Sequence, residues 1–264
     1  MLLHGFPDFW IGWRRQIDAL ATAGFRVIVP DQRGYNTSDK PKAIREYTLP
    51  KLVGDVVAIA DALGIGRFHL VGHDWGGIVA WAAGAKLPHR LERLVILNAP
   101  HPEVLLAHSL RSPTQFLRSS YAAFFQLPLL PEAFLGAGRS ALLARALIKS
   151  SRTDAFTAEE IAEYRQAWER PGALTGMLNW YRALRFRPSL KERITTPTLV
   201  LWGDAGPSSG IWPGRAQSGP LQRSGPADVR EGDALGTVRR GQRGECRASG
   251  VPGRLRCRSV LQVA

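Results

Sequence analysis

The 264-residue chain is poor in cysteine and has no long apolar run. Its two cysteines, Cys246 and Cys257, are too few for a disulfide framework and fit a reducing cytoplasm. No apolar stretch reaches the roughly 18–20 residues that a membrane span requires. Residues 1–20 carry charges and tryptophans where the apolar part of a signal peptide would lie. These absences argue against a disulfide-rich secreted fold and a membrane protein, and we expect a cytoplasmic location.

Acidic residues are also scarce, because 35 Lys and Arg face only 22 Asp and Glu, for a net charge of +13. So basic a chain raises the question of nucleic-acid binding. The excess is spread along the chain, and residues 205–264 contribute ten Arg against four acidic residues. These Arg residues are scattered among Gly, Ser and Pro, without a helical stripe or interleaved aromatics. We therefore expect neither a nucleic-acid nor a membrane partner.

Strand and helix patterns alternate along the first hundred residues. The β-branched run at 26–31 predicts a buried strand, 68–73 and 91–100 predict two more, and 51–65 and 77–87 have helical periodicity. Such alternation is typical of an α/β fold with a mostly parallel sheet and helices on both faces.

Three further regions follow. No strand pattern appears over 103–191, where 156–168 is an amphipathic helix with an acidic first turn, so this region is predicted to be a helical cap. Residues 196–204 return to a strand pattern. The predicted organisation is a core over 1–102, the cap over 103–191, a core strand within 192–204 and a tail over 205–264. Eleven of the 27 glycines fall in that tail, which is too poor in apolar contacts to form a packed strand and helix.

The stretch LVGHDWGGIVAW at 70–81 places an aspartate at a glycine-flanked turn between strand and helix. Gly72, Asp74, Gly76 and Gly77 fit the nucleophile elbow, in which the nucleophile's backbone is strained and its neighbours approach closely. A carboxylate nucleophile attacks carbon that bears a leaving group and yields an alkyl ester. Asp74 therefore selects epoxide or haloalkane chemistry over ester hydrolysis; the simpler alternative is an aspartate that caps a helix.

A second motif lies at 4–10, HGFPDFW, after an apolar stub. His4 and Gly5 begin a loop similar to the oxyanion-hole loop of such folds. The backbone N–H groups of Phe6 and Trp75 are expected to face the oxygen that becomes negative in a tetrahedral intermediate. The alternative is an ordinary Gly-Pro turn.

Together these motifs resemble the α/β-hydrolase fold and, within it, the soluble epoxide hydrolases. The resemblance covers residues 1 to about 204. Its motifs are specific when taken together, and any one of them alone would be weak. It is carried by HGFPDFW (4–10), DQRGYNTSDKP (31–41), GHDWGG (72–77), NAPHP (98–102) and LNWYRA (178–183). It implies that the cap is inserted after the sixth strand of the family's sheet, the one predicted at 91–100.

The resemblance also implies a set of site residues. Two cap tyrosines of the family donate hydrogen bonds to the epoxide oxygen, and Tyr181 and Tyr121 stand at the matching positions. Trp10, Trp75 and Pro7 are expected to wall the substrate pocket. The partners implied are a small epoxide and water, with no metal and no cofactor, and a homodimer is left open.

The family's water-activating histidine and its orienting aspartate are missing from their usual places. All six histidines lie at or before position 108, and Ala205-Gly206 follow Gly203-Asp204 where the second aspartate should stand. Read one base later, degenerate codons for 205–209 permit Arg-Asp-Pro-Val-Val. Those for 232–238 permit Ala-Thr-His-Trp-Val-Gln. We therefore interpret the tail as a frameshifted translation, which resequencing of the gene would test.

The beginning of the chain also differs from the family, in which two strands precede the HGFP loop. Met1 stands three residues before this motif. We expect a sheet that is incomplete at both ends, and an enzyme that stalls after its aspartate is alkylated. The alternatives are a haloalkane or haloacid dehalogenase of the same fold, or a non-catalytic remnant with a basic tail. The sequence leaves open the natural epoxide, the enantioselectivity, the oligomeric state and whether this chain is expressed and active.

Overall fold

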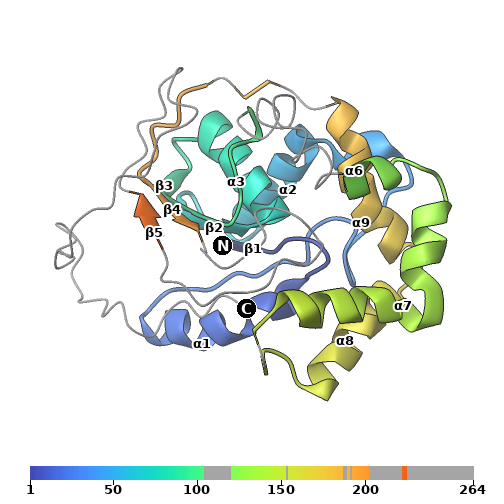
Figure 1. The fold of residues 1–264 in the computed structure, drawn as a ribbon. Helices are drawn as coiled ribbons and strands as arrows, with labels where there is room; N and C mark the ends of the chain where they lie inside the picture. The colour runs from blue at the N-terminus through green and yellow to red at the C-terminus, as the bar shows by residue number, and fades with distance from the viewer. Residues whose placement is uncertain (104–119, 153, 187–188, 191, 203–221, 225–264) are drawn as a thin grey trace.

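A five-stranded sheet forms the centre of the molecule in the computed structural model (Figure 1). The structure describes residues 1–103, 120–152, 154–186, 189–190, 192–202 and 222–224. The strands lie in sequence order: β1 (Leu2–Leu3), β2 (Phe68–His73), β3 (Leu91–Leu97), β4 (Thr198–Trp202) and β5 (Gln222–Ser224). The first four are parallel and β5 is antiparallel to β4. The predicted mostly parallel sheet is confirmed, and the strand at 68–73 has the predicted bounds.

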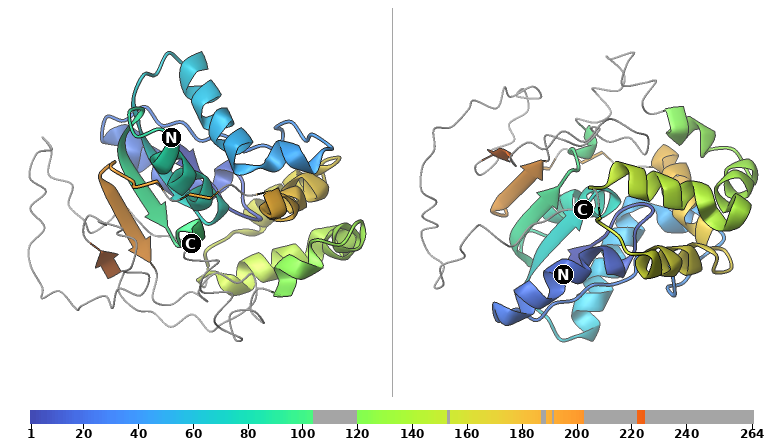
Figure 2. Two further views of the ribbon diagram at one scale, coloured as in Figure 1. Left: turned by 90° about the horizontal axis from the view of Figure 1, so that it is seen from above. Right: turned by 60° about the horizontal axis from the view of Figure 1, so that its bottom comes forward.

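Helices cover both faces of this sheet, because successive strand residues point to opposite sides. The core helices are α1 (Arg14–Thr22), α2 (Leu49–Ala62) and α3 (Trp75–Lys86), with short 3₁₀ turns η1 (Trp10–Trp13) and η2 (Ile44–Tyr47). One face, with Leu2, Leu97 and Leu201, packs against Trp13 and Ile17 of η1 and α1. The other face belongs to the main core with α2 and α3. Figure 2 shows the same layers from two further directions.

Helix α3 can lie close to the sheet because its residues are small. Ten of its twelve residues are buried, and most are Gly or Ala. It begins at Trp75, two residues earlier than the predicted helix at 77–87. The close approach brings the first turn of α3 against the carboxyl ends of β1 and β2, where the site is formed.

The predicted strand at 26–31 is wrong, since the structure assigns no regular strand there. The segment lies beside β1, where the Leu2 N–H donates to the Ile28 carbonyl at 2.8 Å. Val27 and Val29 pack only partly against the core. β1 has two residues, which is too short to support a continuous ladder with a neighbouring segment.

A helical region follows β3 and lies to the right of the sheet in Figure 1. Its helices are α6 (Ser120–Phe124), α7 (Leu130–Ser150), α8 (Ala158–Trp168) and α9 (Ala173–Arg182), followed by η3 (Ala183–Phe186). α7 is kinked where Gly138, Arg139 and Ser140 take positive φ angles. α8 begins with a capping box between Thr157 and Glu160, as its acidic first turn indicates.

The predicted boundaries of the cap, at 103 and 191, stay predictions, as does the division into four regions. Most of the predicted tail lies outside the described residues. The prediction that the tail forms no packed element is wrong at β5, because this strand pairs with Val200–Trp202 of β4. The exposed edge of a sheet offers free backbone groups to any extended segment, whatever its side chains. None of the described helices is both long and apolar enough to cross a membrane.

Candidate active site

Asp74 lies at the turn between β2 and α3, at the carboxyl edge of the sheet. Its φ of 51° places it in the left-handed region, as the nucleophile elbow predicts for a strained residue. The Asp74 N–H donates to the Leu97 carbonyl of β3 at 3.2 Å, and the Asp74 carbonyl accepts from Ile78. The turn is therefore held on both sides, and the half-buried carboxylate projects from its crest. The structure assigns this side chain no bond to the amides of α3 beyond its immediate neighbour, so it is not an ordinary helix cap.

The glycines around Asp74 are required by close packing. A Cβ on Gly5 would lie 2.4 Å from the Asp74 Cβ, and one on Gly76 would lie 2.3 Å from the Leu3 carbonyl oxygen. Gly72 and Gly77 are equally crowded, with contacts of 2.2 Å to Gly76 and 2.4 Å to Ala99. The motif glycines thus allow the HGFP loop, the sheet and α3 to meet at one point.

The HGFP loop is held by His4, which is fully buried. Its Nε2 accepts the Gln32 N–H at 3.0 Å, so the proton stands on Nδ1, which lies 3.0 Å from the Gly5 carbonyl oxygen. The Gln32 side chain donates back to the His4 carbonyl at 2.6 Å. Burial lowers the pKa of His4, which keeps the ring neutral and suits this structural role.

The loop presents its backbone to Asp74. The Phe6 N–H donates to Asp74 Oδ1 at 2.9 Å, and the Trp75 N–H also bonds to this carboxylate. Burial raises the pKa of Asp74, and His73 and these two amides oppose that rise. Two backbone amides therefore stabilise the charged form of this carboxylate.

The two predicted tyrosines lie together above this carboxylate. The Tyr181 ring is 4.9 Å from Trp75 and 5.9 Å from Tyr121 between ring centres. Burial raises the pKa of both phenols, and the charge of Asp74 adds to the rise in each. Trp75 hydrogen-bonds to the Tyr181 phenol through its side chain, and an indole can only donate. Both phenols therefore stay protonated at neutral pH near a carboxylate.

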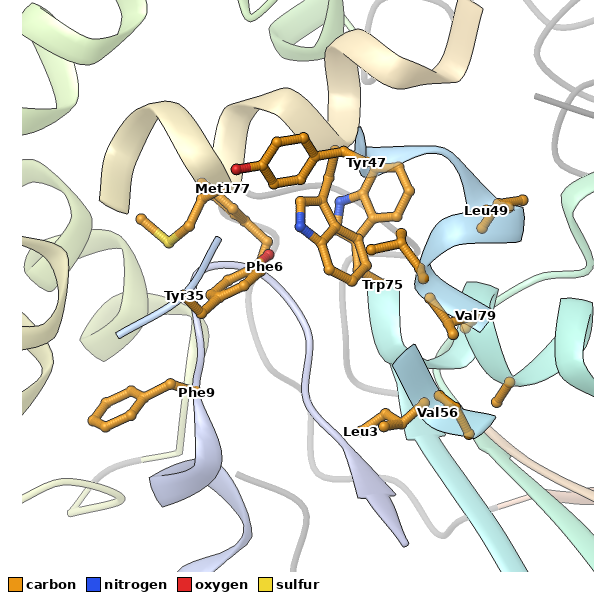
Figure 3. Packing of buried hydrophobic residues seen from close by; sticks show 14 of the residues in the cluster. Leu3, Phe6, Phe9, Tyr35, Tyr47, Leu49, Val56, Trp75, Val79 and Met177 are labelled. Carbon is orange, nitrogen blue, oxygen red and sulfur yellow. The ribbon is translucent and has the colours of Figure 1, made fainter. Parts of the chain in front are cut away.

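Further aromatic residues complete the wall. Phe125 lies 5.0 Å from Tyr181 and 5.8 Å from Phe6, and Trp180 lies 5.7 Å from Trp75. Figure 3 shows Phe6, Tyr35 and Trp75 between the sheet end at Leu3 and the cap residue Met177. This arrangement places a carboxylate beside a cluster of aromatic side chains that includes two phenols.

Comparison with known proteins identifies the family of this chain. The family model described as alpha/beta hydrolase fold matches residues 1–210. The chain belongs to the α/β-hydrolase fold family. A superfamily protein of Bacillus subtilis, YfhM, is 47% identical over 206 residues, which are 77% of this chain and 72% of that protein.

Epoxide hydrolases are among the relatives of this α/β-hydrolase. Human epoxide hydrolase 4 is 39% identical over 77% of this chain and 58% of its own length. An epoxide hydrolase from Bacillus megaterium superposes with a TM-score of 0.71 at 30% identity, covering 78% of this chain and 76% of the other. The chain thus spans little more than half of the length of the vertebrate relatives it matches.

Two residues of this α/β-hydrolase that were predicted to line the pocket, Trp10 and Pro7, make other contacts than Trp75 does. Trp10 is 38% exposed and its ring contacts Phe9, and among the described residues no ring contact joins it to Phe6, Trp75 or Tyr181. Pro7 accepts the Trp168 indole N–H through its carbonyl at 2.6 Å. The structure therefore brings Trp75 to the carboxylate, while Pro7 connects the loop to the cap.

Sequence reasoning missed three contributors to the site. Trp180 stands inside the LNWYRA motif, directly before Tyr181, and Phe125 follows Tyr121 by four residues, so proximity to the two tyrosines was the available signal. Tyr35 is fully buried, and the charges of Asp74 and then Asp8 add to the pKa rise that burial causes in it. Nothing in the sequence around Tyr35 indicates that this residue lies near Asp74.

No metal-binding group was predicted for this α/β-hydrolase. Within the ranges that the structure describes, no group of three or more His, Cys, Asp or Glu is arranged to hold a metal ion.

Proposed function

We propose that this enzyme opens epoxides by attack of the Asp74 carboxylate on an epoxide carbon, forming a covalent alkyl ester. The observation that carries this proposal is the arrangement of Asp74: its Oδ1 is held by the Phe6 N–H, and two phenols whose pKa values respond to its charge face it. Two relatives of this chain, human epoxide hydrolase 4 and the Bacillus megaterium enzyme, are named for the same reaction, which supports the proposal.

In the first step, Oδ2 of Asp74 forms a bond to carbon while the carbon–oxygen bond of the epoxide breaks. The electron pair of that bond goes to the epoxide oxygen, which becomes an alkoxide. Tyr181 and Tyr121 donate hydrogen bonds to this oxygen and one phenol supplies the proton. The products are a hydroxyalkyl ester on Asp74 and one phenolate.

In the second step, water attacks the ester carbonyl, whose oxygen is the former Oδ1. The Phe6 and Trp75 N–H groups then stabilise the oxyanion that develops there. Collapse releases the diol and restores the carboxylate, while the phenolate regains its proton. Attack on this carbonyl requires a base to take a proton from water.

This second step is proposed to be slow. All six histidines lie at or before position 108. Of those around the site, His4 spends both ring nitrogens in hydrogen bonds, and His73 is the neighbour of Asp74 in the chain. Loss of the base in a triad enzyme costs on the order of 10⁴–10⁶ in turnover. We therefore propose that the chain accumulates the ester.

Incubation with styrene oxide followed by intact-protein and peptide mass spectrometry tests the proposal. The expected result is one added styrene oxide mass on the peptide that carries Asp74, with little diol. Asp74→Asn is the matched control, and it should show no adduct. An adduct that persists in this variant would contradict nucleophilic attack by Asp74, and sustained diol formation would contradict the slow second step.

The dehalogenase alternative is disfavoured by the groups around Asp74. Halide binding calls for free indole or amide N–H donors, but Trp75 bonds to Tyr181 and the Trp180 indole donates to the Arg33 carbonyl at 2.9 Å. The charged side chains with the largest effects on the Asp74 pKa are His73 and Asp8, so the strongest influences include no cation suited to a haloacid carboxylate. Halide release from a bromoalkane would overturn this choice.

We also propose that the substrate is a neutral, largely apolar epoxide and that the enzyme acts in the cytoplasm. The aromatic wall of Phe6, Phe125 and Trp75 favours an apolar substituent. The acidic neighbour Asp8 opposes an anionic one. A faster Asp74 adduct with styrene oxide than with an epoxide that carries a carboxylate would support this choice, and the reverse order would overturn it.

A further inference from the structure

A buried guanidinium lies next to the catalytic phenol in the chain. Arg182 is only 6% exposed, and its Nη1 and Nη2 bond to the two carboxylate oxygens of Glu132 at 2.7 and 3.0 Å. Such a bidentate pair fixes the plane of the guanidinium. Glu132 comes from α7, so the pair ties the end of α9 to the beginning of α7.

The remaining donors of Arg182 hold the segment that joins α6 to α7. Its Nε donates to the Phe125 carbonyl at 3.0 Å, and its Nη2 also donates to the Leu127 carbonyl at 2.6 Å. The Asn179 side chain accepts from Nη1 at 3.3 Å. Every nitrogen of the guanidinium is thus used in the described structure.

These bonds form a circuit, a closed set of hydrogen bonds that links the chain segments carrying the two catalytic phenols. The Phe125 N–H donates to the Tyr121 carbonyl at 2.9 Å, so Arg182 holds the turn of helix that carries Tyr121. In return, the Gln126 side chain donates to the Tyr181 carbonyl at 3.0 Å. Tyr181 precedes Arg182 directly. Arg182 and Gln126 therefore link the helix turn that carries Tyr121 to the end of α9 that carries Tyr181.

We propose that Arg182 is a positioning residue that sets Tyr121 against Tyr181, so that both phenols reach one epoxide oxygen. This inference rests on the proposed function and names a residue that acts through Phe125 and Tyr121. The planar fork of arginine is required, because lysine offers a point charge and cannot serve one carboxylate and two carbonyls at fixed angles.

The first test measures the rate of Asp74 alkylation by styrene oxide in Arg182→Lys. We expect a rate roughly 10–100-fold lower, because a misplacement of about 1 Å costs this much in a positioned reaction. The matched control is Arg139→Lys. This arginine pairs with Glu169 in the same cap but is 79% exposed and lies outside the circuit, so the alkylation rate should not change.

A double-mutant cycle separates positioning from general stability. If Arg182 acts by placing Tyr121, then Arg182→Lys should cost at least about twofold less when Tyr121 is already Phe. Equal losses in both backgrounds would overturn the proposal. If Arg182→Lys fails to fold by circular dichroism, the same cycle is run with Glu132→Gln, which keeps arginine but weakens its fixed orientation.

Failure of the proposed function can be told apart from failure of this inference. If the parent chain forms neither adduct nor diol, the proposed function fails. The double-mutant cycle is then repeated with the dissociation constant of phenylacetamide as the measured quantity, and tryptophan fluorescence reports the binding. The neutral carbonyl oxygen of phenylacetamide can accept hydrogen bonds from both phenols. Non-additive affinities would sustain the positioning role, while additive affinities or no binding would overturn it.

Discussion

At the scale of single residues, the site depends on a half-buried carboxylate that is held by two backbone amides. Burial raises the pKa of Asp74 above its ordinary 3.8, while the Phe6 and Trp75 amides limit the rise. The same surroundings hold the phenols of Tyr181 and Tyr121 in their protonated form. Burial favours the neutral form of an isolated group and so keeps the phenols protonated, whereas the two amides favour the charged form of the carboxylate.

The pH dependence of alkylation follows from these directions. Attack requires ionised Asp74, so the rate should fall as pH drops through its raised pKa, above 3.8. Donation requires protonated phenols, and their raised pKa values predict no loss of rate at pH 10. Adduct formation measured by mass spectrometry between pH 4 and 10 checks both limbs. A decline centred near pH 10 would show that an ordinary, exposed tyrosine acts instead.

Asp74 should also lower the stability of the fold. Because its pKa is raised in the folded state, that state binds a proton more tightly than the unfolded chain does, and stability falls as pH rises above 3.8. Asp74→Asn should therefore raise the urea midpoint at pH 7, and this gain should disappear below pH 3.8. An unchanged or lower midpoint at pH 7 would mean that the carboxylate is better solvated than its surroundings imply.

At the scale of elements, the decisive contact is the close approach of α3 to the sheet. Ten of the helix's twelve residues are buried. The helix begins at Trp75, directly after Asp74, so its first turn must fit beneath both β1 and the HGFP loop. Small residues are required there because the neighbouring atoms are backbone, which cannot move aside.

Gly76→Ala should therefore destabilise the protein by about 1–3 kcal/mol, the usual cost of overpacking. Its new Cβ would meet the Leu3 carbonyl oxygen at 2.3 Å. Gly54→Ala in α2 is the control: nothing lies within 4 Å of its Cβ position, and alanine should stabilise this exposed site by about 0.5–1 kcal/mol. Urea unfolding of both variants checks the pair. Similar effects at the two sites would contradict the packing argument.

At the scale of the whole molecule, cap and core are joined through the HGFP loop. The Trp168 indole donates to the Pro7 carbonyl, and the Tyr164 hydroxyl donates to Asp8 Oδ1 at 2.5 Å. Arg14 of α1 pairs with Glu160 of α8 nearby. The roof of the site and its oxyanion donors therefore belong to one connected structure.

Trp168→Phe should cost about 1–3 kcal/mol, because it leaves the Pro7 carbonyl without its donor. It should also slow alkylation, since the loop that presents the Phe6 N–H loses a contact. Trp10→Phe serves as the comparison: Trp10 is 38% exposed, and its replacement should change stability by less than about 0.5 kcal/mol. Urea midpoints and adduct rates are measured together. Slower alkylation in Trp10→Phe would instead support the predicted pocket role of this residue.

The sequence by itself determined the alternation of elements and the glycine-flanked turn at Asp74. These features are local, because periodicity and turn chemistry are properties of neighbouring residues. The edge segment at 26–31 shows the limit, since whether a β-branched run becomes a regular strand depends on the partner beside it. Only the tertiary structure brought Tyr35, Phe125 and Trp180 to the site and joined Arg182 to both phenols. Contacts between residues more than fifty positions apart depend on how elements pack, and no local pattern encodes that.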